Sequence, residues 1–264
     1  MKFVIFGGGC YGTFYARQLL RAQKAGALAV DDILVVDHGE RPHAADLLTD
    51  SAPLQIVRAD WSDFLDAYLD GKIVSEDEHV VPPPFTPHLA FGWLLRTLGR
   101  QFPDAHFTPE SFNRLPGTPF QDQRGHGTLA VSHADWLCPV NCIEPARCPA
   151  TRGPRDWDMD PTVRAFAASL EKAGQAVGRI CLFHCHHLAY GVGTYPVQAL
   201  LDARRDLSTD LADQRQLRFI AGTISRCHGA LHLVHVRRGM DSVSGNASLK
   251  HDSATLSGAA LDDE

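Results

Sequence analysis

The 264-residue sequence lacks any apolar run near the ~18 residues needed to cross a bilayer, so we expect no membrane-spanning helix. At its start only the four apolar residues Phe3–Phe6 precede the first glycine, too few for the core of a secretory signal peptide. A basic excess, which binding along a phosphate backbone requires, is also missing: 25 Lys and Arg face 31 Asp and Glu, a formal net charge of -6. These absences predict a cytoplasmic protein that binds neither membrane nor nucleic acid.

The composition is that of a globular chain, with 44% hydrophobic and 21% charged residues. It contains seven cysteines, an odd number, and fourteen histidines, several of which lie beside the cysteines. A reducing compartment does not maintain structural disulfides, and clustered thiols there more often bind metal or take part in redox chemistry. The composition therefore predicts an α/β protein with a thiol-rich site.

Strand and helix signals alternate in the first part of the chain. Short apolar runs predict strands at 3–6, 33–37, 54–57 and 79–81, and helical spacing of apolar residues predicts helices at 13–25, 61–69 and 88–98. This alternating order is typical of a mostly parallel sheet with right-handed crossovers.

The second part of the chain is less regular. Residues 102–126 contain four prolines with little periodicity and predict a connector. We expect a strand at 128–132, a helix with Asp160 as N-cap, a strand at 180–183, a His-rich turn, a helix at 197–205 and a hairpin of strands at 217–224 and 231–236. The expected divisions are a dinucleotide-binding half, 1–106, a Cys/His-rich metal and substrate half, 107–239, and a disordered tail, 240–264, rich in Ser, Gly and Asp.

A glycine-rich motif joins the first predicted strand to the first predicted helix. The segment Gly7–Gly12 satisfies G-x-G-x-x-G in the strand–turn–helix context that this motif requires. In such a loop the first glycine permits a tight turn, the second lets a pyrophosphate approach the backbone, and the third allows close packing of the helix on the strand. Asp37, at the end of the second predicted strand, is placed to bind ribose hydroxyls and favours NAD over NADP. The predicted cofactor-binding residues are Gly7, Gly8, Gly9, Gly12 and Asp37.

On this motif, the first hundred or so residues resemble the Rossmann-type NAD(P)-binding oxidoreductases. The resemblance implies a Rossmann-like sheet and NAD, or NADP, as cofactor, and it leaves the reaction open. The Cys-rich second half resembles no specific family. The alternative for the glycine motif is a tight turn that only packs a helix on a sheet.

Three cysteines of the second half follow the spacing C-x3-C-x5-C. Cys138, Cys142 and Cys148 lie in a loop stiffened by prolines, which can hold thiolates together once a metal cation cancels their repulsion. An iron–sulfur cluster and zinc both suit this set, and free structural thiols are the alternative. We predict Cys185 as the fourth ligand; the other candidates are Cys181, Cys227 or a histidine.

A second cluster, Cys181–His187, lies where a predicted strand ends. The carboxyl ends of strands are where α/β proteins expose functional groups, so we predict catalytic roles for His184 and His186 as acid or base and for Tyr190 as proton donor. Neighbouring residues of a strand point to opposite faces, so the adjacent histidines do not all serve one site. For each of them, the alternative is a hydrogen-bonded structural side chain.

Together these features predict a cytoplasmic NAD(P)-dependent oxidoreductase with a Cys-ligated metal centre, iron–sulfur or zinc, acting on a small-molecule substrate. Two alternatives remain open: a non-catalytic redox or metal sensor that binds a dinucleotide, and a methyltransferase dependent on S-adenosylmethionine. The oligomeric state, including a homo-oligomer, is also open.

Overall fold

The computed structural model describes residues 1–49, 52–71, 75, 77–84, 86, 88–112, 114–115, 117–139 and 141–239. The predicted tail, 240–264, lies outside the described residues. Within the described ranges, no helix combines the length and the apolar character needed to cross a membrane.

The first sheet has six strands in the order β3-β2-β1-β4-β10-β9. Its parallel part consists of β1 (Lys2–Phe6), β2 (Asp32–Asp37), β3 (Leu54–Arg58) and β4 (Glu78–Val81). The strands β10 (Val192–Pro196) and β9 (His186–Ala189) extend it in antiparallel fashion. The apolar residues of β1 and β4 are buried because both faces of a parallel sheet are covered.

The second sheet is mostly antiparallel. Its order is β6-β7-β12-β11-β8, and β5 also pairs with β12. The strands are β5 (Ala105–Glu110), β6 (Phe120–Gln123), β7 (Thr128–Ser132), β8 (Arg179–His184), β11 (Gln216–Ile224) and β12 (His228–Arg238). Only the pair β8–β11 is parallel.

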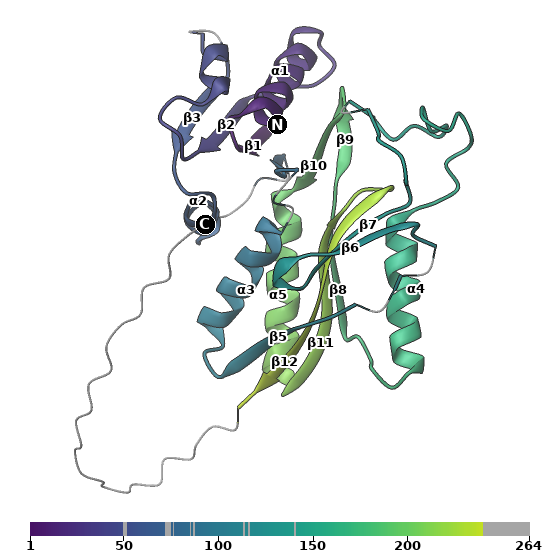
Figure 1. Ribbon diagram of the computed structural model, residues 1–264. Helices are drawn as coiled ribbons and strands as arrows, with labels where there is room; N and C mark the ends of the chain where they lie inside the picture. The colour runs from purple at the N-terminus through teal and green to yellow at the C-terminus, as the bar shows by residue number, and fades with distance from the viewer. Residues whose placement is uncertain are drawn as a thin grey trace, which may run out of the picture.

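Within the described residues, the α-helices lie in three layers around these sheets (Figure 1). α2 (Trp61–Leu69), α3 (Leu89–Gln101) and α5 (Val197–Asp213) lie between the sheets and share one hydrophobic core with both. α1 (Cys10–Lys24) covers the outer face of the first sheet, and α4 (Met159–Lys172) covers the outer face of the second. The described residues also contain two short 3-10 helices, His43–Leu47 and Gly125–Gly127.

The chain crosses from the second sheet to the first at Cys185. β8 ends at His184 and β9 begins at His186, so Cys185 alone separates strands that belong to different sheets. Its backbone N–H donates to the carbonyl of Ile224 at 2.7 Å, which ties the crossing point to the end of β11.

The α/β class expected from the sequence is confirmed, with parallel pairing concentrated in the first four strands. Three local expectations are wrong. The predicted connector, 102–126, contains β5 and β6; β5 tolerates Pro109 because it lies at the edge of its sheet. The predicted His-rich turn is the β9–β10 hairpin. The N-cap of α4 is Asp158, whose carboxylate accepts the N–H of Asp160.

Candidate functional site

The glycine loop between β1 and α1 has a different requirement at each glycine. Gly7 has a φ of 93°, in the left-handed region that favours glycine. A Cβ on Gly12 would lie 1.6 Å from the carbonyl oxygen of Gly7, and one on Gly8 would lie 2.5 Å from Pro42 Cβ. A Cβ on Gly9, by contrast, would meet no atom within 4 Å. The fold therefore requires Gly7, Gly8 and Gly12, whereas Gly9 borders open space.

Asp37, at the end of β2, stabilises this loop through hydrogen bonds. Its carboxylate accepts the backbone N–H of Gly8 at 2.6 Å and that of Gly39 at 2.7 Å. The N-cap of α1 is Gly9, which supplies no side-chain cap, and the first turn of the helix contains no acidic residue. The predicted contact of Asp37 with a ribose stays a prediction.

A pocket of about 310 Å³ lies where the two sheets meet. Tyr15 of α1 and Pro82–Pro84, which follow β4, form one wall, and the turn between β11 and β12 forms another. Besides Tyr15, the ionisable side chains that line the pocket are Cys138, Cys142, Glu144, Cys185, His187, Cys227 and His228. The pocket therefore gathers thiols from segments that are far apart in the sequence.

Three of the four predicted metal ligands, Cys138, Cys142 and Cys185, line this pocket. The fourth, Cys148, does not line the pocket; it is buried in the loop that also carries Cys138 and Cys142. Burial, and then the neighbouring thiols of Cys142 and Cys148, raise the pKa of Cys138. Burial, and then Glu144, raise the pKa of Cys185 to about 12.

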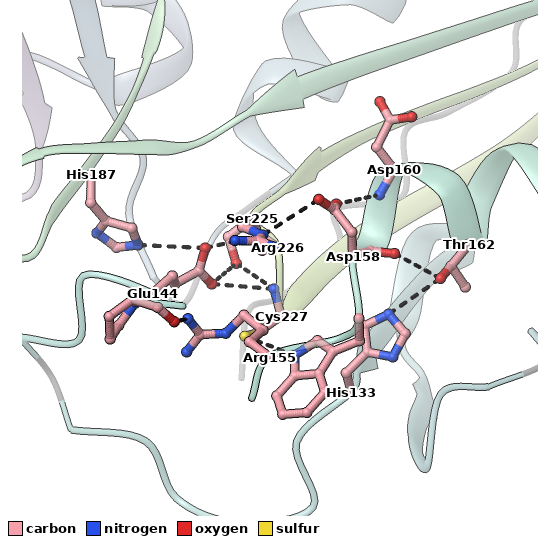
Figure 2. Close-up of polar contacts among 12 residues, drawn as sticks. His133, Glu144, Arg155, Asp158, Asp160, Thr162, His187, Ser225, Arg226 and Cys227 are labelled. Carbon is pink, nitrogen blue, oxygen red and sulfur yellow. Dashed lines mark hydrogen bonds and ion pairs between the residues drawn. The ribbon is translucent and has the colours of Figure 1, made fainter. Parts of the chain in front are cut away.

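Glu144 joins the loop that carries Cys138, Cys142 and Cys148, called the cysteine loop below, to the β11–β12 turn (Figure 2). Its carboxylate accepts the hydroxyl of Ser225 at 2.7 Å and the backbone N–H groups of Arg226 and Cys227 at 3.0 and 3.2 Å. Burial acts to raise the pKa of Glu144, but these hydrogen bonds outweigh it, so the pKa is lowered. The carboxylate thus brings Cys142, two residues away in the loop, toward Cys227.

The sequence motifs placed Cys227 only among the alternatives for a ligand, yet it lines the pocket. Its sulfur accepts the indole N–H of Trp157 at 3.2 Å, and Arg155 lies beside it and donates to the carbonyl of Pro145 (Figure 2). The available sequence signal was the dipeptide Cys227-His228 between two predicted strands.

The predicted catalytic residues lie outside the pocket lining. His184 and His186 place their rings together, with centroids 4.5 Å apart, whereas Cys185 and His187 line the pocket, as the alternation of side chains along an extended chain requires. Tyr190 lies under the guanidinium of Arg21, and its carbonyl accepts the Gln18 amide at 3.1 Å.

His187 is the histidine that the sequence analysis passed over. Its Nε2 lies 3.9 Å from the Glu144 carboxylate, and burial lowers its pKa although Glu144 opposes this effect. The sequence predicted a turn where the structure has β9. Without the strand and its register, nothing indicated that His187 and not His186 faces the pocket.

In the part of the chain that the structure describes, no group of three or more Cys, His, Asp or Glu side chains stands in a geometry that would hold a metal ion. The thiols share one pocket, but their present positions do not form a ligand set. Metal binding is therefore a proposal that needs its own experiment.

Fold and pocket together define an α/β protein with a cysteine-lined pocket at the junction of two sheets. Residues 90–237 match the model of the family AF_1314_C, "Uncharacterized protein, C-terminal domain", and because the match covers more than half of the chain, the chain belongs to this family. The matched region contains the four pocket cysteines and excludes the glycine loop. No curated protein and no solved structure matches the chain.

Proposed function

We propose that this chain is a cytoplasmic NAD(P)-dependent oxidoreductase that binds its dinucleotide at the glycine loop and carries a Cys-ligated metal centre in the adjacent pocket. A small-molecule substrate would bind in the same pocket.

The position of the pocket relative to the first sheet carries this proposal. From β1 the chain continues to β2 on one side, while β4 lies on the other side of β1. Open α/β sheets bind ligands outside the carboxyl ends of their strands, at the point where the strand order reverses. The pocket lies beyond the end of β4 and against Tyr15 of the helix that starts at the glycine loop. A dinucleotide held by that loop would extend toward the thiols.

In this proposal, different residues of the chain bind the nucleotide, hold the glycine loop in place and form the pocket. The open space at Gly9 admits a pyrophosphate to the start of α1, and Asp37 keeps the loop in shape through Gly8. Tyr15 and the prolines after β4 line the pocket on the side of the first sheet. A bound nicotinamide would supply the hydride, and a metal centre would relay single electrons or polarise a carbonyl.

The types of donor group in the pocket suit the proposed metal. Thiolates and a neutral imidazole are the ligands that zinc and iron–sulfur centres take. Four thiols and His187 line one pocket, and burial favours the neutral form of that imidazole.

Substitution of Gly9 by valine tests the nucleotide site with little disturbance of the fold. The new side chain enters open space and occupies the position of the pyrophosphate, so we expect NADH affinity to fall by roughly 100-fold or more, as expected when a ligand group can no longer reach its donors. The matched control is Gly99→Val in α3, where a Cβ likewise meets nothing within 4 Å. NADH binding is measured by calorimetry and turnover by loss of nicotinamide absorbance with an artificial electron acceptor.

Three results would contradict the proposed oxidoreductase function. Unchanged NADH affinity in Gly9→Val would mean that the loop only packs the helix. NADH binding with no turnover of any acceptor would favour the sensor. Binding of S-adenosylmethionine without NADH binding would favour the methyltransferase.

A further inference from the structure

Four of the seven cysteines line the pocket, and they reach it from three separate segments. Cys138 and Cys142 belong to the cysteine loop, Cys185 to the crossing between β8 and β9, and Cys227 to the turn between β11 and β12. The other three thiols, Cys10, Cys148 and Cys181, do not line it. Three unrelated parts of the chain thus bring sulfur to one cavity.

Two of these sulfurs accept hydrogen bonds from N–H groups. The sulfur of Cys142 accepts the backbone N–H of Glu144 at 3.4 Å, and the sulfur of Cys227 accepts the Trp157 indole N–H at 3.2 Å. Hydrogen bonds to the ligating atoms are typical of protein metal sites, where they orient the ligands and tune the metal.

A buried cation, Arg155, lies beside one of these thiols, that of Cys227. Arg155 is only 7% exposed, and its Nε–H is buried without a hydrogen-bond partner. The neighbours that favour its charged form are Cys227, Cys142 and Glu144. Of these, the Glu144 carboxylate already accepts three other hydrogen bonds. A buried guanidinium is costly unless an anion balances it. Thiolates on Cys142 and Cys227 would provide that anion.

We propose that Cys138, Cys142, Cys185 and Cys227 are the thiolate ligands of a metal centre and that Arg155 is its buried counter-charge. This inference rests on the metal half of the proposed function, and it replaces Cys148 in the predicted ligand set with Cys227. On binding, each thiol releases its proton to solvent and rotates toward the centre of the pocket. Four thiolates around a divalent ion, or around an iron–sulfur cluster, leave a net negative charge, which Arg155 offsets.

Two serine substitutions distinguish the ligand set that contains Cys227 from the one that contains Cys148. Cys227 and Cys148 are each 3% exposed, so Cys227→Ser and Cys148→Ser disturb equally buried positions and are matched for effects on folding. We expect Cys227→Ser, like Cys138→Ser, Cys142→Ser and Cys185→Ser, to lose most of its metal. Cys148→Ser should keep it. Metal content of the purified full chain is measured by mass spectrometry, and thermal unfolding reports the fold of each variant.

Direct titration identifies the centre without relying on variants alone. Co²⁺ added to the metal-free native chain should give the intense sulfur-to-cobalt absorption of a thiolate site, which Zn²⁺ then displaces. Anaerobic purification with a visible absorption spectrum distinguishes an iron–sulfur cluster from zinc. Metal should also protect the four pocket thiols of the native chain, but not Cys10, from alkylation.

Two outcomes would overturn the inference: a chain that holds no metal and binds neither Co²⁺ nor Zn²⁺ through sulfur, or a metal retained in Cys227→Ser but lost in Cys148→Ser. Neither outcome bears on nucleotide binding, which the Gly9 variant tests. Conversely, loss of nucleotide binding in Gly9→Val leaves the metal content unchanged. Failure of the metal centre and failure of the oxidoreductase are therefore distinguishable.

Arg155 is a positioning residue in this scheme, and its charge has a separate test. Arg155→Met should weaken Zn²⁺ binding by roughly 10–100-fold, the usual effect of removing a group that supports a metal's ligands. Arg155→Lys should restore a large part of the affinity because it keeps the charge. Equal affinities of the two variants would show that the guanidinium contributes packing and not counter-charge.

Discussion

Protein surroundings favour the neutral form of several histidines in this chain. Burial lowers the pKa of His79, His184, His187 and His228, because an imidazolium in these positions would lose its hydration. His79 lies in β4 of the first sheet. Its ring stacks on Phe3 with centroids 5.7 Å apart, and its Nδ1 lies 3.4 Å from the hydroxyl of Thr194.

The lowered pKa of His79 predicts how stability depends on pH. An unfolded histidine has a pKa of about 6.5, so below that pH the unfolded chain binds more protons than the folded one, and the free energy of unfolding falls. In His79→Gln this position no longer titrates. We expect the loss of stability between about pH 7 and about pH 5.5, measured by urea unfolding, to be smaller in the variant. Equal losses in both proteins would contradict a buried neutral His79.

At the residue scale the sequence indicated which thiols would lie together better than it indicated the side chains around them. The loop spacing and the cluster after β8 pointed to Cys138, Cys142 and Cys185, all of which line the pocket. The contribution of Cys227 depends on the β11–β12 hairpin meeting the cysteine loop through Glu144, a contact between residues more than eighty positions apart. No spacing pattern within a short window contains that information.

Elements with a strong local pattern were predictable, and those that depend on pairing were not. The expected helix at 61–69 coincides with α2, whose N-cap Asp60 accepts the N–H groups of Ser62 and Asp63. β6 and β9 are short and largely polar, with the sequences FQDQ and HHLA, and they are strands because β7 and β10 supply their hydrogen-bond partners. Tertiary pairing of this kind overrides local propensity.

The contact between β1 and α1 makes its own prediction. Because a Cβ on Gly12 would lie 1.6 Å from the Gly7 carbonyl oxygen, Gly12→Ala must push α1 away from β1, and we expect a loss of ~2 kcal/mol or more in the free energy of unfolding. Gly9→Ala adds the same methyl group to open space and should cost less than ~1 kcal/mol. Denaturant unfolding of the two variants measures the difference. A Gly12→Ala variant as stable as Gly9→Ala would show that α1 relaxes without cost.

At the scale of the whole molecule, the two expected halves of the chain are interleaved. β9 and β10, from the second half, complete the first sheet through the pairing of β10 with β4. α3, from the first half, packs in the same core as β11 and β12. The expected boundary after residue 106 also falls within β5, which pairs with β12. The pocket depends on this interleaving, because its walls come from both halves.

This shared core predicts that the second half does not fold alone. A fragment of residues 107–239 lacks β1, β4 and α3, so the apolar faces of α5 and of the second sheet that these elements cover would be exposed to water. We expect the fragment to show poor amide dispersion by NMR and no cooperative thermal transition, whereas residues 1–239 unfold in a single step. Mixing fragments 1–106 and 107–239 should recover part of the native signal, because each supplies the surface that the other needs. A fragment 107–239 with native-like dispersion and cooperative unfolding would establish an independent domain, and the pocket would then be an interface between two domains.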